Sequence, residues 1–156
     1  MNLKQLYQDI ILEHGKSPRN LGKCEGYSHE AKGYNPLCGD KVHVYLKLDN
    51  GNKVEGLTFE GEGCAISLAS ASIMTELIRG KSINDAKDIM NAFLNMIKNT
   101  SNIQSNHLDE DQKIKLMSLS GVRQYPMRVK CATLSWHTLI SAIDNTQEEI
   151  NTERLD

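Results

Sequence analysis

Residues 38–64 read CGDKVHVYLKLDNGNKVEGLTFEGEGC, and this stretch predicts a β-hairpin with a cysteine at each end. Apolar and polar side chains alternate over residues 41–48, which is typical of a strand with one buried face. Residues 49–52 (DNGN) have the composition of a turn, and residues 54–59 predict the returning strand. The alternation slips at Gly56, where we expect a β-bulge.

Helical periodicity lies on both sides of this hairpin, because apolar residues recur three and four positions apart. The helices predicted in this way span residues 3–14, 65–78, 82–97, 112–119 and 126–143. Residues 99–111 are polar and rich in turn formers, so we expect an exposed loop there. Strands early in the chain and helices late predict an α+β fold, in which a small antiparallel sheet of about three strands has helices packed on one face.

The length of 156 residues predicts one domain, which we assign to residues 1–143. Residues 144–156 contain five acids and one arginine, and we expect them to form an acidic, frayed tail. The domain is long enough to bury a hydrophobic core without help from disulfides.

Composition excludes several classes of protein. The net charge of −2 leaves no basic excess for nucleic-acid binding. No apolar stretch approaches the ~20 residues of a membrane span, and the first residues lack the apolar core of a signal peptide. We therefore expect a cytoplasmic protein, in which cysteines stay reduced and serve as metal ligands or reactive thiols.

The hairpin brings three chemically active residues together. Cys38 and Asp40 precede its first strand and Cys64 follows its second, so all three are expected at one end of the sheet. Gly39, which has no Cβ, allows close approach of a metal or a partner. Cys131 comes near the start of the last predicted helix, whose N-terminus favours a thiolate. Three thiolates and a carboxylate form a four-ligand set suited to zinc or iron–sulfur chemistry.

Two interpretations of these cysteines remain open on spacing alone. No CxxC pair is present, and three unrelated buried cysteines would give the same pattern. Local charge favours the metal site, because Arg128 and Lys130 flank Cys131 and could balance the negative ligands. The alternative is that these cations are ordinary surface residues.

The other candidate residues carry no catalytic prediction. Cys24 lies in a glycine-rich loop without ligand-type neighbours, and we expect it to be structural. We expect His14 to interact with the end of its helix, and we find no histidine with a partner for catalysis. The serines among residues 65–72 indicate close helix packing rather than a serine nucleophile.

Three motifs stand out in the sequence: NPLCGD at 35–40, FEGEGCAIS at 59–67 and RVKCATLSW at 128–136. Together they resemble those of a known family, the U-type iron–sulfur assembly proteins SufU, IscU and the N-terminal domain of NifU. The IscU branch carries a histidine at the position of Lys130 and a chaperone motif that this sequence lacks, so the resemblance is to the SufU type.

This resemblance implies a SufU/IscU-like fold and a role in iron–sulfur cluster biogenesis. Cys38, Asp40, Cys64 and Cys131 would hold zinc, and Cys38 would accept persulfide sulfur from a PLP-dependent, SufS-like cysteine desulfurase. Sulfur would then pass to a downstream iron–sulfur scaffold or to apo-proteins. The activity is sulfurtransferase-like rather than that of a stand-alone enzyme.

Two alternatives use the same residues. In the first, Cys38, Asp40, Cys64 and Cys131 hold iron in a transient [2Fe–2S] cluster that the protein assembles and passes on. In the second, the chain is a structural zinc module that only binds another protein.

Overall fold

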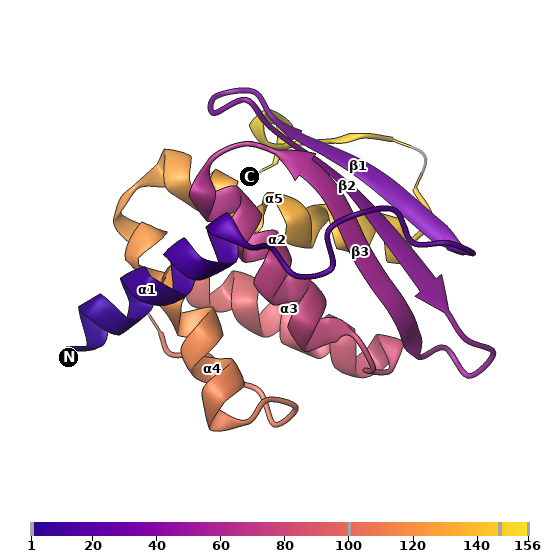
Figure 1. Cartoon of the computed structure of the whole chain (residues 1–156), viewed down its shortest axis with the longest axis horizontal. Coiled ribbons are helices and arrows are strands. Elements are labelled where there is room, and N and C mark those ends of the chain that lie inside the picture. The colour runs from indigo at the N-terminus through magenta and orange to yellow at the C-terminus, as the bar shows by residue number, and fades with distance from the viewer. Residues whose placement is uncertain (1, 100, 147, 156) are drawn as a thin grey trace.

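The computed structural model describes residues 2–99, 101–146 and 148–155. Figure 1 shows a twisted sheet on one side of the molecule and the helices packed against its inner face. The elements follow in chain order: α1 (Leu3–Lys16), β1 (His29–Asn35), β2 (Asp40–Leu48), β3 (Val54–Glu62), α2 (Ala65–Ile78), α3 (Ile83–Lys98), α4 (Glu110–Met117), the 3₁₀ helix η1 (Ser118–Gln124), α5 (Pro126–Ile143), β4 (Ile150–Asn151) and the 3₁₀ helix η2 (Thr152–Arg154). The predicted α+β fold is confirmed.

The sheet has the strand order β3-β2-β1-β4 in the described residues, and the predicted hairpin is its centre. β1, β2 and β3 run antiparallel, while β4 runs parallel to β1. The register shifts where Lys47 pairs with Gly56 but Leu48 pairs with Val54. Glu55 is therefore the extra residue of a β-bulge, one position before the glycine at which the sequence predicted it.

The first strand lies where the sequence predicted only a loop. The inward-facing residues of β1 are Ala31, Gly33 and Asn35, which carry no hydrophobic signal for a strand. Close packing explains this composition, because a Cβ on Gly33 would lie 2.1 Å from Thr138 Oγ1 of α5. Only glycine fits at this position, where α5 crosses the sheet.

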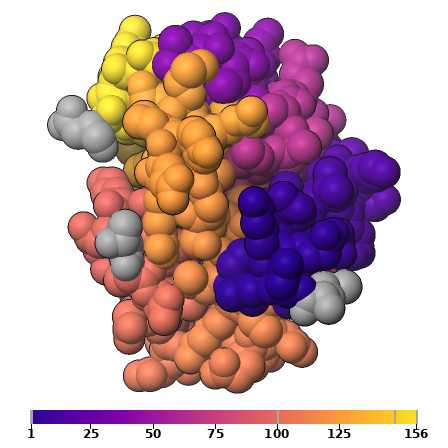
Figure 2. Space-filling view, turned by 90° about the vertical axis from the view of Figure 1, so that its left-hand side faces the viewer, coloured from indigo at the N-terminus to yellow at the C-terminus, as the bar shows by residue number. Residues whose placement is uncertain are grey.

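The C-terminal segment is ordered against the sheet, whereas the sequence predicted a frayed tail. Ile150 and Asn151 pair with Gly33 and Tyr34 of β1, and Thr152 is only 1% exposed. Figure 2 shows this segment in yellow beside the orange start of α5. The tail contributes a strand because its backbone pairs with a sheet edge, which acidic side chains do not prevent.

The helices bury the core on the inner face of the sheet. Trp136 of α5 stacks on Phe93 of α3 with ring centroids 4.2 Å apart, and its indole N–H donates to Ser70 Oγ of α2 at 2.9 Å. The small residues of α2 let it contact α1, α5 and β3, as the sequence predicted. Among the residues that the structure describes, no helix is both long and apolar enough to cross a membrane.

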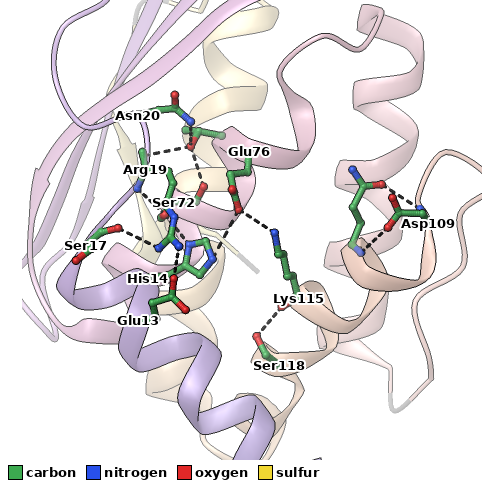
Figure 3. Close-up of polar contacts among 12 residues, drawn as sticks. Glu13, His14, Ser17, Arg19, Asn20, Ser72, Glu76, Asp109, Lys115 and Ser118 are labelled. Carbon is green, nitrogen blue, oxygen red and sulfur yellow. Dashed lines mark hydrogen bonds and ion pairs between the residues drawn. The ribbon is translucent and has the colours of Figure 1, made fainter.

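A buried polar cluster fixes α1 against α2 and α4 (Figure 3). The ring of His14 is 3% exposed, and its Nδ1 lies 2.7 Å from Ser72 Oγ of α2. Its Nε2 lies 3.7 Å from Glu76 Oε1, which also pairs with Lys115 of α4 at 3.2 Å. His14 therefore joins three helices, whereas the sequence predicted only an interaction with the end of its own helix.

The contacts of His14 with Ser72 and Glu76 resemble those of a catalytic triad, but the serine cannot reach a substrate. Ser72 is fully buried, and its Oγ accepts a hydrogen bond from the Arg19 backbone N–H at 2.8 Å. This supports the sequence prediction that these serines serve helix packing.

We predict that His14 makes folding sensitive to acid. Burial lowers the pKa of His14 below its ordinary 6.5, and the nearby Arg19 cation adds to this effect. The unfolded chain therefore takes up this proton at a higher pH than the folded chain, so the free energy of unfolding falls as the pH drops below about 6.5. His14→Gln should cost about 1–2 kcal/mol at pH 7, because Ser72 loses a buried partner. It should also lose less stability than the wild type between pH 7 and pH 5.

Urea unfolding of the metal-free protein at a series of pH values measures both effects. His29→Gln, at the start of β1 and outside the buried cluster, is the matched control for replacement of a histidine. Equal pH dependence in His14→Gln and the wild type would show that His14 does not contribute. Burial also lowers the pKa of His137, so part of the acid sensitivity should survive in the variant.

Candidate metal centre

The candidate site is built where three strand ends meet. Asn35 at the end of β1 pairs with Asp40 at the start of β2, and the turn between them carries Cys38. Gly39 in this turn has φ of 72°, a conformation that glycine adopts without strain. Lys41 pairs with Glu62, so β3 ends beside the start of β2 and leads directly into Cys64.

Three of the four predicted ligands lie close together. The ligand atoms of Cys38, Asp40 and Cys131 all fall within 4.8 Å of one another. Cys131 lies in the second turn of α5, 1% exposed, with its Sγ 3.1 Å from Cys38 Sγ. Within the described parts of the chain, this is the single group of three or more cysteine, histidine or carboxylate donors at such distances.

Asp40 is the fixed point of this group. It is fully buried, and its Oδ1 accepts the Cys64 backbone N–H at 2.9 Å. Its Oδ2 accepts the Asn35 side-chain amide at 3.0 Å. Gly63 has φ of 151°, and a Cβ there would lie 2.3 Å from Asp40 Oδ1. Position 63 therefore has no room for a side chain beside the carboxylate.

Cys64 lies outside the group of three but interacts with Cys131. It is the N-cap residue of α2. The nearby Cys131 thiol lowers the pKa of Cys64 against the opposing effect of burial, and the Ser67 and Ile66 backbone N–H groups lower it further. Cys64 and burial raise the pKa of Cys131, whose thiol donates to Cys38 Sγ at 3.1 Å. Cys64 is therefore the thiol of this pair that ionises first.

The predicted cations take different positions. Lys130 Nζ lies 2.9 Å from Glu153 Oε1, so its charge is directed at the C-terminal segment. Arg128 is exposed and lines a groove between α1, η1 and α5 with a volume of about 610 Å³, shared with Tyr7 and Tyr125. Among the ion pairs of the described residues, none involves Asp40.

Cys24 lies at the other end of the sheet. A Cβ on Gly56 would be 3.0 Å from its Sγ, and Gly56 pairs with Lys47 near the far end of β2. His43 also lies apart from the sulfur group, with its Nε2 2.9 Å from Glu30 Oε1 on the outer face of the sheet. These placements agree with the sequence interpretation that neither is a ligand.

Sequence reasoning assigned no role to Asn35, Gly63 or Thr152. Asn35 is fully buried, and its Nδ2 also lies 3.5 Å from Cys131 Sγ. Thr152 donates a hydrogen bond to Asn35 Oδ1 at 2.9 Å. The available signal was the position of Asn35 within the motif NPLCGD, whereas nothing in the tail pointed to Thr152.

Comparison with known proteins identifies the family to which the chain belongs. Residues 6–132 match the model of the NifU-like N-terminal domain. The zinc-dependent sulfurtransferase SufU of Bacillus subtilis (strain 168) is 43% identical over 138 residues, covering 88% of this chain and 89% of that protein. The iron–sulfur cluster assembly scaffold protein IscU of Streptococcus pyogenes serotype M1 is 36% identical over 141 residues, covering 90% and 84%.

A solved structure supports the same relationship. The crystal structure of FiSufU from the thermophile Fervidobacterium islandicum AW-1 superposes with a TM-score of 0.78 at 36% identity, covering 89% of this chain and 97% of that one. The family model spans β1, β2, β3 and the α5 residues up to Ala132, so it contains all the cysteines of the candidate site. The chain therefore belongs to the NifU-like N-terminal domain family.

Proposed function

We propose that the chain is a zinc-bound sulfur acceptor that takes persulfide sulfur from a PLP-dependent cysteine desulfurase for iron–sulfur cluster biogenesis. The observation that carries this proposal is the group of Cys38, Asp40 and Cys131, whose ligand atoms lie within 4.8 Å of one another, with Cys64 beside it. The similarity to a zinc-dependent sulfurtransferase supports it. We further propose that the protein acts in the cytoplasm, where its thiols stay reduced.

The donor set fits zinc. Zinc takes four ligands in tetrahedral geometry and binds thiolates and carboxylates. Cys38, Cys64, Cys131 and Asp40 are the residues that would hold it. The carboxylate is already oriented by two hydrogen bonds, so little ordering would remain for the metal to impose. A bound zinc ion would keep its sulfur ligands deprotonated at neutral pH.

Cys38 is the donor best placed to react with a partner protein. It is half-buried in the turn between β1 and β2, whereas Cys131 is buried in a helix. In the proposed step, the Cys38 thiolate attacks the outer sulfur of the desulfurase persulfide. The S–S bond of that persulfide breaks, its electron pair leaves with the desulfurase cysteine, and a new S–S bond forms on Cys38. No external oxidant or reductant is consumed.

Apolar side chains around this turn support a protein as the sulfur donor. Leu37 is 50% exposed directly before Cys38. Met127, one helical turn before Cys131, is 51% exposed. Exposed large hydrophobic side chains beside a reactive residue are typical of a docking surface.

A second function uses the same donors as a scaffold for a transient [2Fe–2S] cluster. The similarity to the IscU scaffold of S. pyogenes favours it. Reconstitution separates the two functions: stable zinc without cluster acquisition supports sulfur transfer, and iron with acid-labile sulfide supports the scaffold. Zinc without reactivity toward a desulfurase would indicate a structural module instead.

The ligand assignment predicts which cysteines hold the metal. Protein purified anaerobically should contain about one zinc ion per chain. Cys38→Ser, Cys64→Ser and Cys131→Ser should each lower the zinc content, because a serine hydroxyl does not replace a thiolate ligand. Cys24→Ser is the matched control and should retain zinc. Elemental analysis after chelator treatment measures this, and loss of zinc in Cys24→Ser with retention in Cys131→Ser would contradict the assignment.

The proposed role of Cys38 predicts where sulfur arrives. After incubation with a cysteine desulfurase and ³⁵S-cysteine, peptide mapping under non-reducing conditions should locate the label on Cys38. Cys38→Ala should abolish labelling and any increase in desulfurase turnover, because no other thiol lies in the exposed turn. Label on Cys64 or Cys131 but never on Cys38 would refute this step, as would unchanged turnover with Cys38→Ala.

A further inference from the structure

The C-terminal segment 148–155 reaches the candidate metal site through one buried side chain, Thr152. Its hydroxyl donates to Asn35 Oδ1 at 2.9 Å, although the two residues are 117 positions apart in the chain. Asn35 in turn donates through Nδ2 to Asp40 Oδ2 at 3.0 Å and faces Cys131 Sγ at 3.5 Å. One amide group therefore connects the tail to two proposed metal ligands.

The orientation of the Asn35 amide matters for both ligands. Its NH₂ end can donate to a carboxylate and to a sulfur, whereas its carbonyl end would repel both. The Thr152 hydroxyl gives the carbonyl end a donor on the opposite side. Without that hydroxyl, Asn35 Oδ1 would be buried with no partner in this arrangement, which favours rotation of the amide away from its present orientation.

Independent contacts hold the segment in place. Ile150 and Asn151 pair with Gly33 and Tyr34, directly before Asn35 in β1. Glu153 pairs with Lys130, the residue before Cys131, at 2.9 Å. In Figure 2 the yellow segment lies at the upper left, beside both the purple and the orange surfaces. The tail thus contacts β1, which carries Asn35, and α5, which carries Cys131.

We infer that Thr152 is a positioning residue, whose hydroxyl fixes the Asn35 amide and thereby the Asp40 carboxylate and the Cys131 sulfur in the geometry that binds metal. This inference rests on the ligand set of the proposed function. The C-terminal segment then acts as a latch on the metal site. Release of the latch would loosen the site without removing any ligand.

Thr152→Val removes the hydroxyl and keeps the shape of the side chain. Zinc release to an excess of a chromogenic chelator should become about tenfold faster, the low end of the effect of losing a group that orients metal ligands. The absorption bands of the cobalt(II)-substituted protein should shift, because the carboxylate donor is no longer fixed. Thr152→Ser restores the hydroxyl and should restore both wild-type values.

Thr138→Val is the matched control for loss of a buried threonine hydroxyl. Thr138 is fully buried in α5, and its Oγ1 donates only to the Leu134 carbonyl of its own helix. Zinc release and the cobalt spectrum should match the wild type. An effect as large as that of Thr152→Val would show that loosening of the core, and not the Asn35 amide, is responsible, and would overturn the inference.

A measurement on zinc-free protein distinguishes failure of this inference from failure of the proposed function. In zinc-free protein, Thr152→Val should shift the Asn35 side-chain amide signals in a ¹⁵N-correlated NMR spectrum, whereas Thr152→Ser should not. If the wild type binds no zinc but this shift occurs, the zinc assignment fails and the positioning role stands. Unmoved Asn35 signals in Thr152→Val overturn the inference. If the wild type binds zinc, release of zinc from Thr152→Val at the wild-type rate also overturns it.

A second variant covers the case in which Thr152→Val does not fold. Glu153→Gln breaks the ion pair with Lys130 and leaves the buried hydroxyl intact, so it weakens the docking of the segment alone. It should also accelerate zinc release, but by less than tenfold, because such exposed ion pairs contribute little to stability. Wild-type release with unmoved Asn35 signals in this variant would count against the latch.

Discussion

The buried carboxylate of Asp40 is the constraint on which this end of the molecule depends. A charged group taken out of water costs several kcal/mol unless other groups replace its hydration. Here the Cys64 N–H and the Asn35 amide do so, at 2.9 and 3.0 Å. These donors come from the end of β1 and the start of α2, so satisfying one carboxylate joins three chain segments. The same crowding requires a glycine at position 63.

The donors of the site differ in how firmly the fold holds them. Asp40 and Cys131 lie in regular elements and are buried, whereas Cys38 lies in a turn beside an exposed leucine. A metal site that also reacts with a partner needs both properties. The fixed donors keep the geometry, and the donor in the turn can move with a small change in backbone conformation. The position of each cysteine in the fold therefore matches the role proposed for it.

The parts of the fold that sequence reasoning could predict are those with a periodic apolar signal. The hairpin of β2 and β3 and the helices follow from alternation and helical spacing, and the hairpin alone brings Cys38, Asp40 and Cys64 to one end of the sheet. β1 has no such signal, because close packing of α5 leaves no room for a side chain at Gly33. β4 is only two residues long, which is too short for a periodic signal. Contacts such as Thr152 with Asn35 join distant segments, and only the folded chain reveals them.

The cations that flank Cys131 in the sequence do not balance the charge of the site. Lys130 is engaged by Glu153, and Arg128 points to a separate groove, so neither neutralises the sulfur group in the way that their sequence positions suggested. The cysteines affect one another: the nearby Cys131 thiol lowers the pKa of Cys64, whereas Cys64 and burial raise the pKa of Cys131. A divalent cation would stabilise several thiolates at once, and metal binding at such a site is accompanied by proton release. The fold thus supplies the donors and their orientation, while the charge that lets all of them act as thiolates has to come from the bound cation.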